Sequence, residues 1–234
     1  MNSGQLPLWS PQANHSRFDN FHVEAGSANA LLVKDLRAYL LNAETTPFYF
    51  YGESGAGKTH LHIAASNLFR ELGNSDTVYI DCASESAQAS MLTAFIDASC
   101  FCLDNIDAWS GSSEAEQAIF AVVEKAKNSS QRLIVSAKQS PKNNAFDLAD
   151  LVSRLASGVV YELFSLKDAG KLKVLQKSLE ERDLKVDEKV IHYLLTHFSR
   201  DNHSLFDAIK KLDRASLIEK RKLTIPFVQK ILAD

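Results

Sequence analysis

A lysine and a threonine after a glycine-rich turn are the residues of this chain best suited to chemistry. Lys58 and Thr59 end a segment, residues 52–59, that fits the pattern G-x-x-x-x-G-K-[ST] in full. Glycines at this spacing let successive backbone N–H groups surround a phosphate at a helix N-terminus. We therefore predict a nucleotide site in which the lysine contacts the β- and γ-phosphates and the threonine hydroxyl reaches Mg²⁺. The expected nucleotide-contacting residues of this loop are Gly52, Ser54, Gly55, Ala56, Gly57, Lys58, Thr59 and His60.

The alternative interpretation of residues 52–59 is a glycine-rich turn that binds nothing. A β-favouring aromatic run precedes the loop and a helix-like run follows it, which is the context that the motif requires. The flanks and the complete motif together favour nucleotide binding.

A second candidate for chemistry is Asp104, which ends the apolar run 100–103. An aspartate at the carboxyl end of a parallel strand beside a phosphate loop can hold Mg²⁺ directly or through water, although many strands simply end at an aspartate. The next residue is Asn105, where many P-loop ATPases carry an acidic residue that activates the attacking water. An amide can orient a water but cannot accept its proton. We expect slow hydrolysis by this chain alone, unless Asp107 substitutes as the base.

The third candidate is Arg154, just before the last strand expected in the α/β region. One interpretation is a structural salt bridge. The other is an arginine finger delivered to the γ-phosphate of a neighbouring subunit, where such a group can raise the rate of hydrolysis about 10³- to 10⁵-fold.

Alternating strands and helices are expected to position these residues. The apolar patterns predict strands at 46–51, 77–81, 100–103, 132–136 and 158–163 and helices at 27–42, 58–72, 87–95, 113–127 and 147–154. Ser113 and Glu116 have the spacing of a capping box. The alternation predicts an α/β fold in which helices cover both faces of a parallel sheet.

After residue 165 the pattern changes to amphipathic helices. The predicted organisation is a tail at 1–16, an α/β nucleotide-binding domain at 17–164 and a helical lid at 165–234.

Composition narrows the class of protein. The 234 residues are 45% hydrophobic and 24% charged, with a net charge of −3, as in an ordinary soluble globular protein. The apolar runs fall short of the roughly 20 residues that a membrane helix needs, so we expect a cytoplasmic protein. Cys82, Cys100 and Cys102 lack metal-ligand spacing and are interpreted as reduced core thiols. Lysine and arginine are absent between Arg70 and Lys125, which argues against direct DNA binding there.

The N-terminal tail contains an apolar island at residues 5–9. A tail that cannot fold around leucine and tryptophan side chains would expose them for the groove of a partner, or pack back on its own domain. The residues expected to contact a partner are Gln5, Leu6, Leu8 and Trp9.

Together these motifs resemble the AAA+ family of P-loop proteins, and within it the DnaA-related proteins, most closely the Hda-like regulators. The resemblance rests on residues 18–21, 57–61, 103–106, 153–155 and 212–228. It implies an AAA+ α/β domain with a helical lid, bound ADP or ATP with Mg²⁺, and a base pocket lined by Phe21, His22 and Val23.

The resemblance also implies a function and partners. The expected protein binds the β sliding clamp of DNA polymerase III through its tail, holds ADP, and inserts Arg154 into the nucleotide site of ATP-bound DnaA. It would thereby act as a negative regulator of replication initiation. The sequence ends where DnaA continues into its DNA-binding domain, so sequence-specific DNA binding is not expected. The resemblance also allows a homo-oligomer.

The chain departs from the family pattern at two places. Residues 201–204 lack the usual sensor 2 arginine, so His203 would have to contact the nucleotide. The segment 136–138 lacks the acidic residue that DnaA carries after the fourth strand. Both departures predict loose discrimination of the γ-phosphate.

Two other functions fit part of the pattern. A self-sufficient ATPase, such as a helicase loader, predicts substantial intrinsic turnover and a contact with single-stranded DNA. A pure adaptor, in which nucleotide only stabilises the fold, predicts that Arg154→Ala changes nothing while loss of Leu8 and Trp9 abolishes activity.

Overall fold

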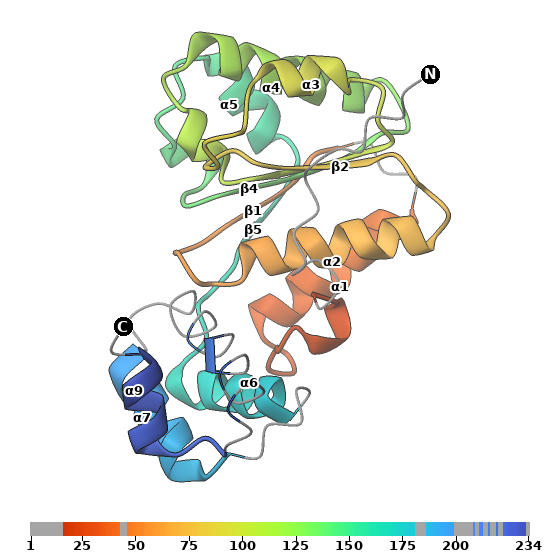
Figure 1. Cartoon of the computed structure of the whole chain (residues 1–234). Helices are drawn as coiled ribbons and strands as arrows, with labels where there is room; N and C mark the ends of the chain where they lie inside the picture. The colour runs from red at the N-terminus through yellow and green to blue at the C-terminus, as the bar shows by residue number, and fades with distance from the viewer. Residues whose placement is uncertain are drawn as a thin grey trace, which may run out of the picture. The chain divides into compact units, whose positions relative to one another are not determined.

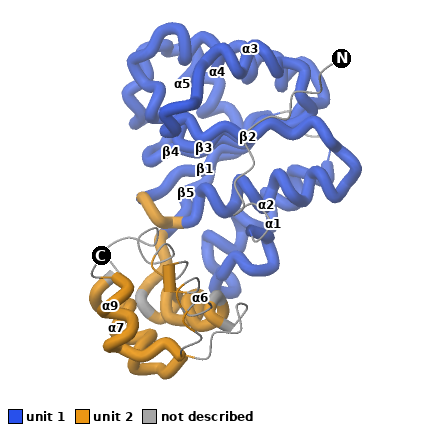
Figure 2. The backbone as a smooth tube through the Cα atoms, in the orientation of Figure 1, with its two compact units in different colours: residues 1–53, 57–164 blue, residues 54–56, 165–234 orange. Residues whose placement is uncertain are grey.

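The computed structural model describes residues 16–42, 46–180, 186–198, 208, 211, 212, 215, 219 and 222–232. The chain divides into two compact units, one of residues 1–53 and 57–164 and one of residues 54–56 and 165–234 (Figure 2). The tail residues Gln5, Leu6, Leu8 and Trp9 lie outside the described residues, and so does His203.

A five-stranded parallel sheet forms the centre of the first unit. Its strands are β1 (Phe48–Tyr51), β2 (Thr77–Asp81), β3 (Cys100–Asp104), β4 (Arg132–Ala137) and β5 (Val159–Glu162). The strand order is β2-β3-β4-β1-β5, and every neighbouring pair is parallel. Since β1 lies between β4 and β5, the loop that follows β1 starts at the carboxyl edge of the sheet, between these two strands. The predicted α/β class is confirmed.

Helices cover both faces of this sheet (Figure 1). One face carries α1 (Ala28–Leu41) and α2 (Lys58–Glu71), and the other carries α3 (Ser90–Ala94), α4 (Ser113–Lys127) and α5 (Ala149–Ala156). The described residues also include the short 3₁₀ helices η2 (Phe18–Asn20), η3 (Ile106–Trp109) and η4 (Pro141–Asn143). Helix α3 is shorter than predicted.

The predicted capping box of α4 is wrong. The helix begins at Ser113, but its N-cap is Ser112, whose hydroxyl accepts a hydrogen bond from the backbone N–H of Ala115. Glu116 instead turns into the protein and accepts hydrogen bonds from the backbone N–H groups of Gly111 and Leu148. Two consecutive serines, Ser112 and Ser113, made the cap ambiguous, because either could supply the hydroxyl.

Side chains of the central strands alternate between the two layers of helices. In β1, Phe48 and Phe50 contact Tyr39 and His62 on the α1 and α2 side. Tyr49 points the other way, into the core shared with α4 and α5. Burial on both faces explains why the central strands read as continuous apolar runs. All three cysteines are free and buried, as expected of core thiols.

The regular secondary structure described in the second unit is helical. They include α6 (Asp168–Glu180), α7 (Glu188–Phe198) and α9 (Ile225–Leu232). Leu175, Leu194, Leu212 and Phe227 are among the buried residues of its separate apolar core. The second unit therefore has a core of its own, as an independent small domain requires.

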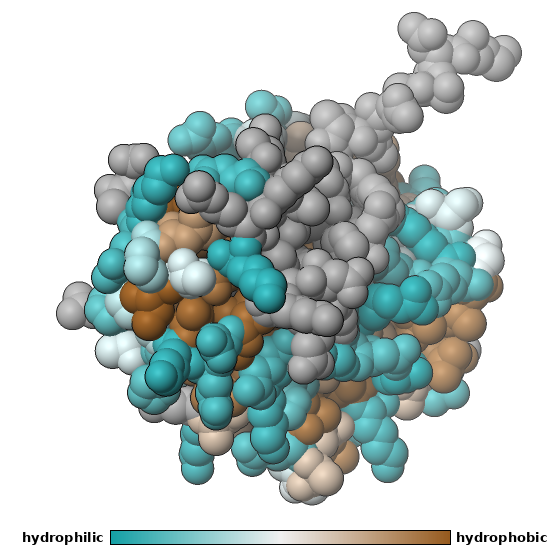
Figure 3. Space-filling view, turned by 60° about the horizontal axis from the view of Figure 1, so that its bottom comes forward, coloured by the Kyte–Doolittle hydropathy of each residue, from teal (hydrophilic) through white to brown (hydrophobic). Residues whose placement is uncertain are grey.

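The surface combines hydrophilic side chains with exposed apolar ones. Hydrophilic residues occupy much of the face drawn in Figure 3. The exposed large apolar side chains among the described residues are Leu31, Leu41, Leu72, Val160 and Phe164. In the described part of the chain, no helix has both the length and the apolar character to span a membrane.

Candidate functional site

The glycine-rich loop connects β1 to α2. At its start, the backbone N–H of Gly52 donates to the carbonyl of Ala137 at the end of β4, 3.2 Å away. At its end, Gly57 is the N-cap of α2 with a φ of 106°. A Cβ at this position would lie 2.7 Å from the ring of Phe21. Both the left-handed backbone and the close aromatic ring therefore require glycine here.

Lys58 is held by the loop that precedes it. Its ammonium donates to the carbonyls of Gly52 at 2.8 Å and Glu53 at 3.0 Å. Burial lowers the pKa of Lys58, while the nearby carboxylates of Asp104 and Asp107 oppose this effect. The side chain is thus enclosed at the glycine-rich loop, where the predicted contact with phosphate requires it.

The carboxylate of Asp104 is fully buried beside Thr59. The Thr59 hydroxyl donates to Asp104 Oδ2 at 2.5 Å, and the Tyr79 hydroxyl donates to the same oxygen at 3.3 Å. Ser136 donates to the other oxygen, Oδ1. A hydroxyl and a carboxylate in contact are the hard oxygen ligands that Mg²⁺ prefers, so these residues fit the predicted cation.

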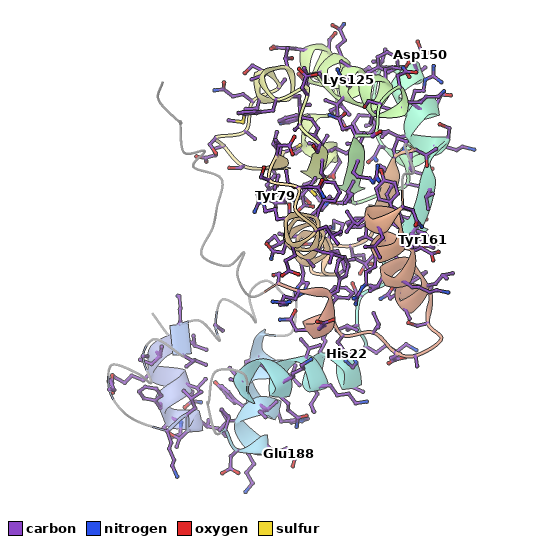
Figure 4. The ribbon with its side chains drawn as sticks, turned by 90° about the vertical axis from the view of Figure 1, so that its right-hand side faces the viewer. His22, Tyr79, Lys125, Asp150, Tyr161 and Glu188 are labelled. Atoms are coloured by element: carbon purple, nitrogen blue, oxygen red, sulfur yellow. The ribbon has the colours of Figure 1, made fainter. Side chains whose placement is uncertain are left out.

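Sequence reasoning did not identify two residues around Asp104, Tyr79 and His62, and it considered Ser136 only as part of the segment 136–138. Tyr79 and Ser136 come from β2 and β4, the two strands that flank β3, so the strand order would have identified them. His62 is buried on α2, with Nε2 3.9 Å from Asp104 Oδ1 and its ring 5.0 Å from that of Phe50. Its position one turn after Thr59 places it on the sheet-facing side of the helix. Tyr79 is labelled in Figure 4.

Asn105 adopts a left-handed backbone conformation with a φ of 55°. Asparagine tolerates this region better than most residues. Its side-chain amide donates to Asp81 Oδ1 at 2.9 Å. Asp107 is also engaged, because Oδ1 accepts from the Lys138 backbone N–H and Oδ2 lies 3.6 Å from the Lys138 ammonium. Each of the two residues considered for activating water therefore has a partner in the same chain.

The residues expected to line a base pocket lie near the start of α2. The rings of Phe21 and His60 are 5.3 Å apart, and His60 Nε2 lies 3.0 Å from the carbonyl of Arg17. Phe21, His22 and Val23 are all half-buried, and His22 is labelled in Figure 4. The structure brings Phe21 to the phosphate loop, and the role of these residues in holding a base stays a prediction.

Arg154 lies in the last turn of α5, away from the phosphate loop. Its side chain is 39% exposed, and Nε lies 2.6 Å from Oε1 of Glu124 on α4. Helix α5 leads into β5, where Val159 pairs with Phe48 at the start of β1, whereas the phosphate loop follows the end of β1. Arg154 and the loop therefore lie toward opposite ends of the same strand.

Comparison with protein families agrees with this architecture. The model of the bacterial DnaA ATPase domain matches residues 13–162. The chain belongs to the bacterial DnaA ATPase-domain family. A separate model, the lid domain of Hda, matches residues 168–232. The chain is therefore an Hda-like, DnaA-related AAA+ protein, and these matches support a general role in the regulation of replication initiation.

Individual relatives extend over nearly the whole chain. A Haemophilus influenzae protein, described only as uncharacterized, is 37% identical over 230 residues, covering 97% of this chain and 98% of that protein. Domain III of the Thermotoga maritima replication initiation protein DnaA has the same fold, with a TM-score of 0.78, 20% identity and coverage of 96% of this chain and 97% of that chain. AMPPCP-bound DnaA from Aquifex aeolicus gives a TM-score of 0.69 at 23% identity, covering 87% and 65%.

Proposed function

We propose that this DnaA-related protein is a negative regulator of replication initiation that accelerates hydrolysis of ATP bound to DnaA. In this mechanism the protein holds ADP and Mg²⁺ in its own site, binds the sliding clamp through Gln5, Leu6, Leu8 and Trp9, and inserts Arg154 into the nucleotide site of DnaA. The match to the Hda lid domain and the match to the DnaA ATPase domain support this combination.

The position of Arg154 is the observation that carries the proposal. The guanidinium is partly exposed on α5 and lies toward the end of β1 opposite the phosphate loop. A phosphate that it stabilises must therefore belong to another molecule. A guanidinium placed at the developing charge on a transferred phosphoryl group can raise the rate of hydrolysis by about 10³- to 10⁵-fold.

Residues of the chain's own site are suited to holding a nucleotide more than to hydrolysing it. Lys58 and the loop N–H groups would contact the phosphates, and Thr59 with Asp104 would hold Mg²⁺, which neutralises phosphate charge when bound. Asn105 cannot accept a proton, and the Asp107 carboxylate is engaged by Lys138. The relative bound to AMPPCP supports nucleotide binding in this fold, and ADP as the working nucleotide is part of the proposal.

Conversion of labelled ATP on DnaA to ADP, with clamp loaded on DNA, tests the proposal. We expect the wild-type protein to accelerate conversion and the Arg154→Ala variant to lose at least 100-fold of that acceleration. Equal acceleration by both proteins would favour the adaptor function. No acceleration by the wild type would refute the regulatory function.

Clamp binding is tested separately, because it depends on the N-terminal tail. A variant in which Gln5, Leu8 and Trp9 are all alanine should lose binding to immobilised clamp while keeping its nucleotide affinity. Undiminished binding would show that the clamp contact lies elsewhere in the chain.

A self-sufficient ATPase is the second candidate function. The contact between Thr59 and Asp104 and the enclosed Lys58 favour it, because the groups that bind phosphate and Mg²⁺ are all in place. It predicts steady turnover of ATP without DnaA, which a phosphate-release assay on the isolated protein would detect.

A further inference from the structure

Two glutamates of α4 contact α5 and the segment that leads into it. Glu116 is buried, and its carboxylate accepts hydrogen bonds from the backbone N–H groups of Asp147 at 3.2 Å and Leu148 at 2.7 Å, immediately before α5. Glu124, two turns further along α4, meets Arg154 in the last turn of α5. Figure 4 shows the two helices side by side, with Lys125 labelled on α4 and Asp150 on α5. Helix α4 therefore fixes both the start of α5 and the arginine near its end.

The contact of Glu124 with Arg154 is short and half-enclosed. Nε and Oε1 are 2.6 Å apart, and the glutamate side chain is 32% exposed. Oε1 itself is shielded from solvent and accepts no hydrogen bond from the described residues, so the contact with Arg154 is an ion pair. A carboxylate charge beside Nε favours the rotamers that keep the guanidinium at Glu124, and the other donors of the guanidinium belong to its two terminal nitrogens.

We propose that Glu124 is a positioning residue that holds the Arg154 guanidinium ready for a phosphate on the partner. The inference rests on the proposed function, because it assigns a role to Glu124 only if Arg154 acts in trans. A free arginine side chain samples many rotamers, and ordering it during docking would reduce the rate. The Glu124 carboxylate removes much of this freedom in advance. It does so through Nε and leaves the terminal nitrogens to face the phosphate.

The opposite role for the same contact is a restraint. Glu124 would then compete with phosphate for the guanidinium, and its removal would release Arg154 and increase the rate. Positioning and restraint therefore predict changes of opposite sign, which makes the contact testable. The geometry favours positioning, because the closest approach uses Nε rather than the terminal nitrogens.

The test measures hydrolysis of ATP on DnaA, with clamp loaded on DNA, as a function of the concentration of the full-length protein. The variants are Glu124→Ala, Glu124→Asp, Glu124→Gln and Arg154→Ala. The matched control is Asp97→Ala, which removes the carboxylate that pairs with Lys125 of α4 at 2.8 Å and leaves Arg154 untouched. Urea unfolding of each variant separates loss of fold from loss of positioning.

We expect Glu124→Ala to lower the maximal rate about five- to tenfold without changing the half-saturating concentration. Glu124→Asp keeps the charge but draws it back by one methylene, so it should also lower the maximal rate. Glu124→Gln keeps the side-chain length and an oxygen near Nε but not the charge, so its maximal rate should fall between those of Glu124→Ala and the wild type. Asp97→Ala should match the wild type.

An unchanged or raised maximal rate in both Glu124→Ala and Glu124→Asp would overturn the inference. If Glu124→Ala does not fold, Glu124→Asp decides alone. These outcomes are distinct from failure of the proposed function. In that case the wild type itself gives no acceleration, or Arg154→Ala accelerates as well as the wild type.

Discussion

Asp104 and Arg154 are both ionisable residues of the first unit, but they differ in burial and in their polar partners. Asp104 has no exposed surface and accepts hydrogen bonds from the hydroxyls of Thr59, Tyr79 and Ser136. Arg154 is partly exposed and forms an ion pair with Glu124. In the proposed function, the enclosed carboxylate serves a ligand that this chain binds itself. The partly exposed arginine serves a phosphate on another molecule.

The enclosed site should depend most strongly on Lys58. We expect Lys58→Ala to weaken binding of ADP with Mg²⁺ by about 100-fold or more, because it removes a charge-assisted contact with the phosphates. Isothermal titration calorimetry measures this change. Burial lowers the pKa of Lys58, so the charged side chain does not favour folding, and the variant should be as stable as the wild type without nucleotide.

The control for this variant is Lys125→Ala. It removes a lysine that pairs with Asp97 on the surface, far along the chain from the loop. Its affinity for ADP should equal that of the wild type. Equal affinities for all three proteins would show that the loop does not hold phosphate through Lys58.

The comparison also predicts that an enclosed carboxylate matters for the fold. Glu116 is buried and accepts from three backbone N–H groups, those of Gly111, Asp147 and Leu148. We expect Glu116→Gln to reduce the free energy of unfolding by about 2 kcal/mol, because the new amide N–H₂ would face a backbone donor. Urea denaturation measures the change.

Glu114→Gln is the matched control for Glu116→Gln, since Glu114 is exposed in the first turn of the same helix. It should change stability by less than about 0.5 kcal/mol. Similar losses in the two variants would mean that the charge near the helix N-terminus matters and the three backbone contacts do not.

Substitution of Asn105 tests whether the site at Asp104 can be made to hydrolyse ATP without a partner protein. Asn105→Asp alone would oppose two carboxylates, because the amide now donates to Asp81 at 2.9 Å. Exchanging the pair, with Asn105→Asp and Asp81→Asn together, restores one donor and one acceptor and places a base beside Asp104. We expect the exchanged variant to raise intrinsic hydrolysis about tenfold, a small part of what a well-placed base contributes.

A phosphate-release assay without DnaA compares the exchanged variant with its two single variants. Asp81→Asn is the control, because it changes the pair without adding a base. A rate for the exchanged variant no higher than that of Asp81→Asn would show that Asn105 does not limit hydrolysis.

The sequence indicated the residues that meet at Asp104 better than it indicated the contact of Arg154. A phosphate loop and an aspartate ending a strand are local patterns, so Lys58, Thr59 and Asp104 could be identified from spacing alone. Tyr79 and Ser136 join the site through the order β2-β3-β4, which is a property of the sheet and not of either segment. The ion pair joins Arg154 of α5 with Glu124 of α4, two residues that are 30 positions apart in the sequence. No spacing rule predicts that contact, because it depends on how α4 and α5 pack.

Asp76 differs from Arg154, because it is an exposed charged residue whose hydrogen-bond partner lies in the same chain. Asp76 Oδ2 accepts from the Ser99 backbone N–H at 3.0 Å and from its hydroxyl at 2.7 Å. The hydroxyl bond is the main reason that the pKa of Asp76 is below its usual value. The folded pKa is thus lower than the unfolded one, so the ionised carboxylate stabilises the fold above the unfolded pKa of about 4. That contribution disappears as the pH falls through the folded pKa.

We expect Asp76→Asn to lower the free energy of unfolding by about 0.5 kcal/mol at pH 7 and by less below pH of about 4, as measured by urea denaturation across this range. The exposed Glu85→Gln variant serves as control, and a cost for Asp76→Asn that stayed constant on acidification would mean that its charge plays no part.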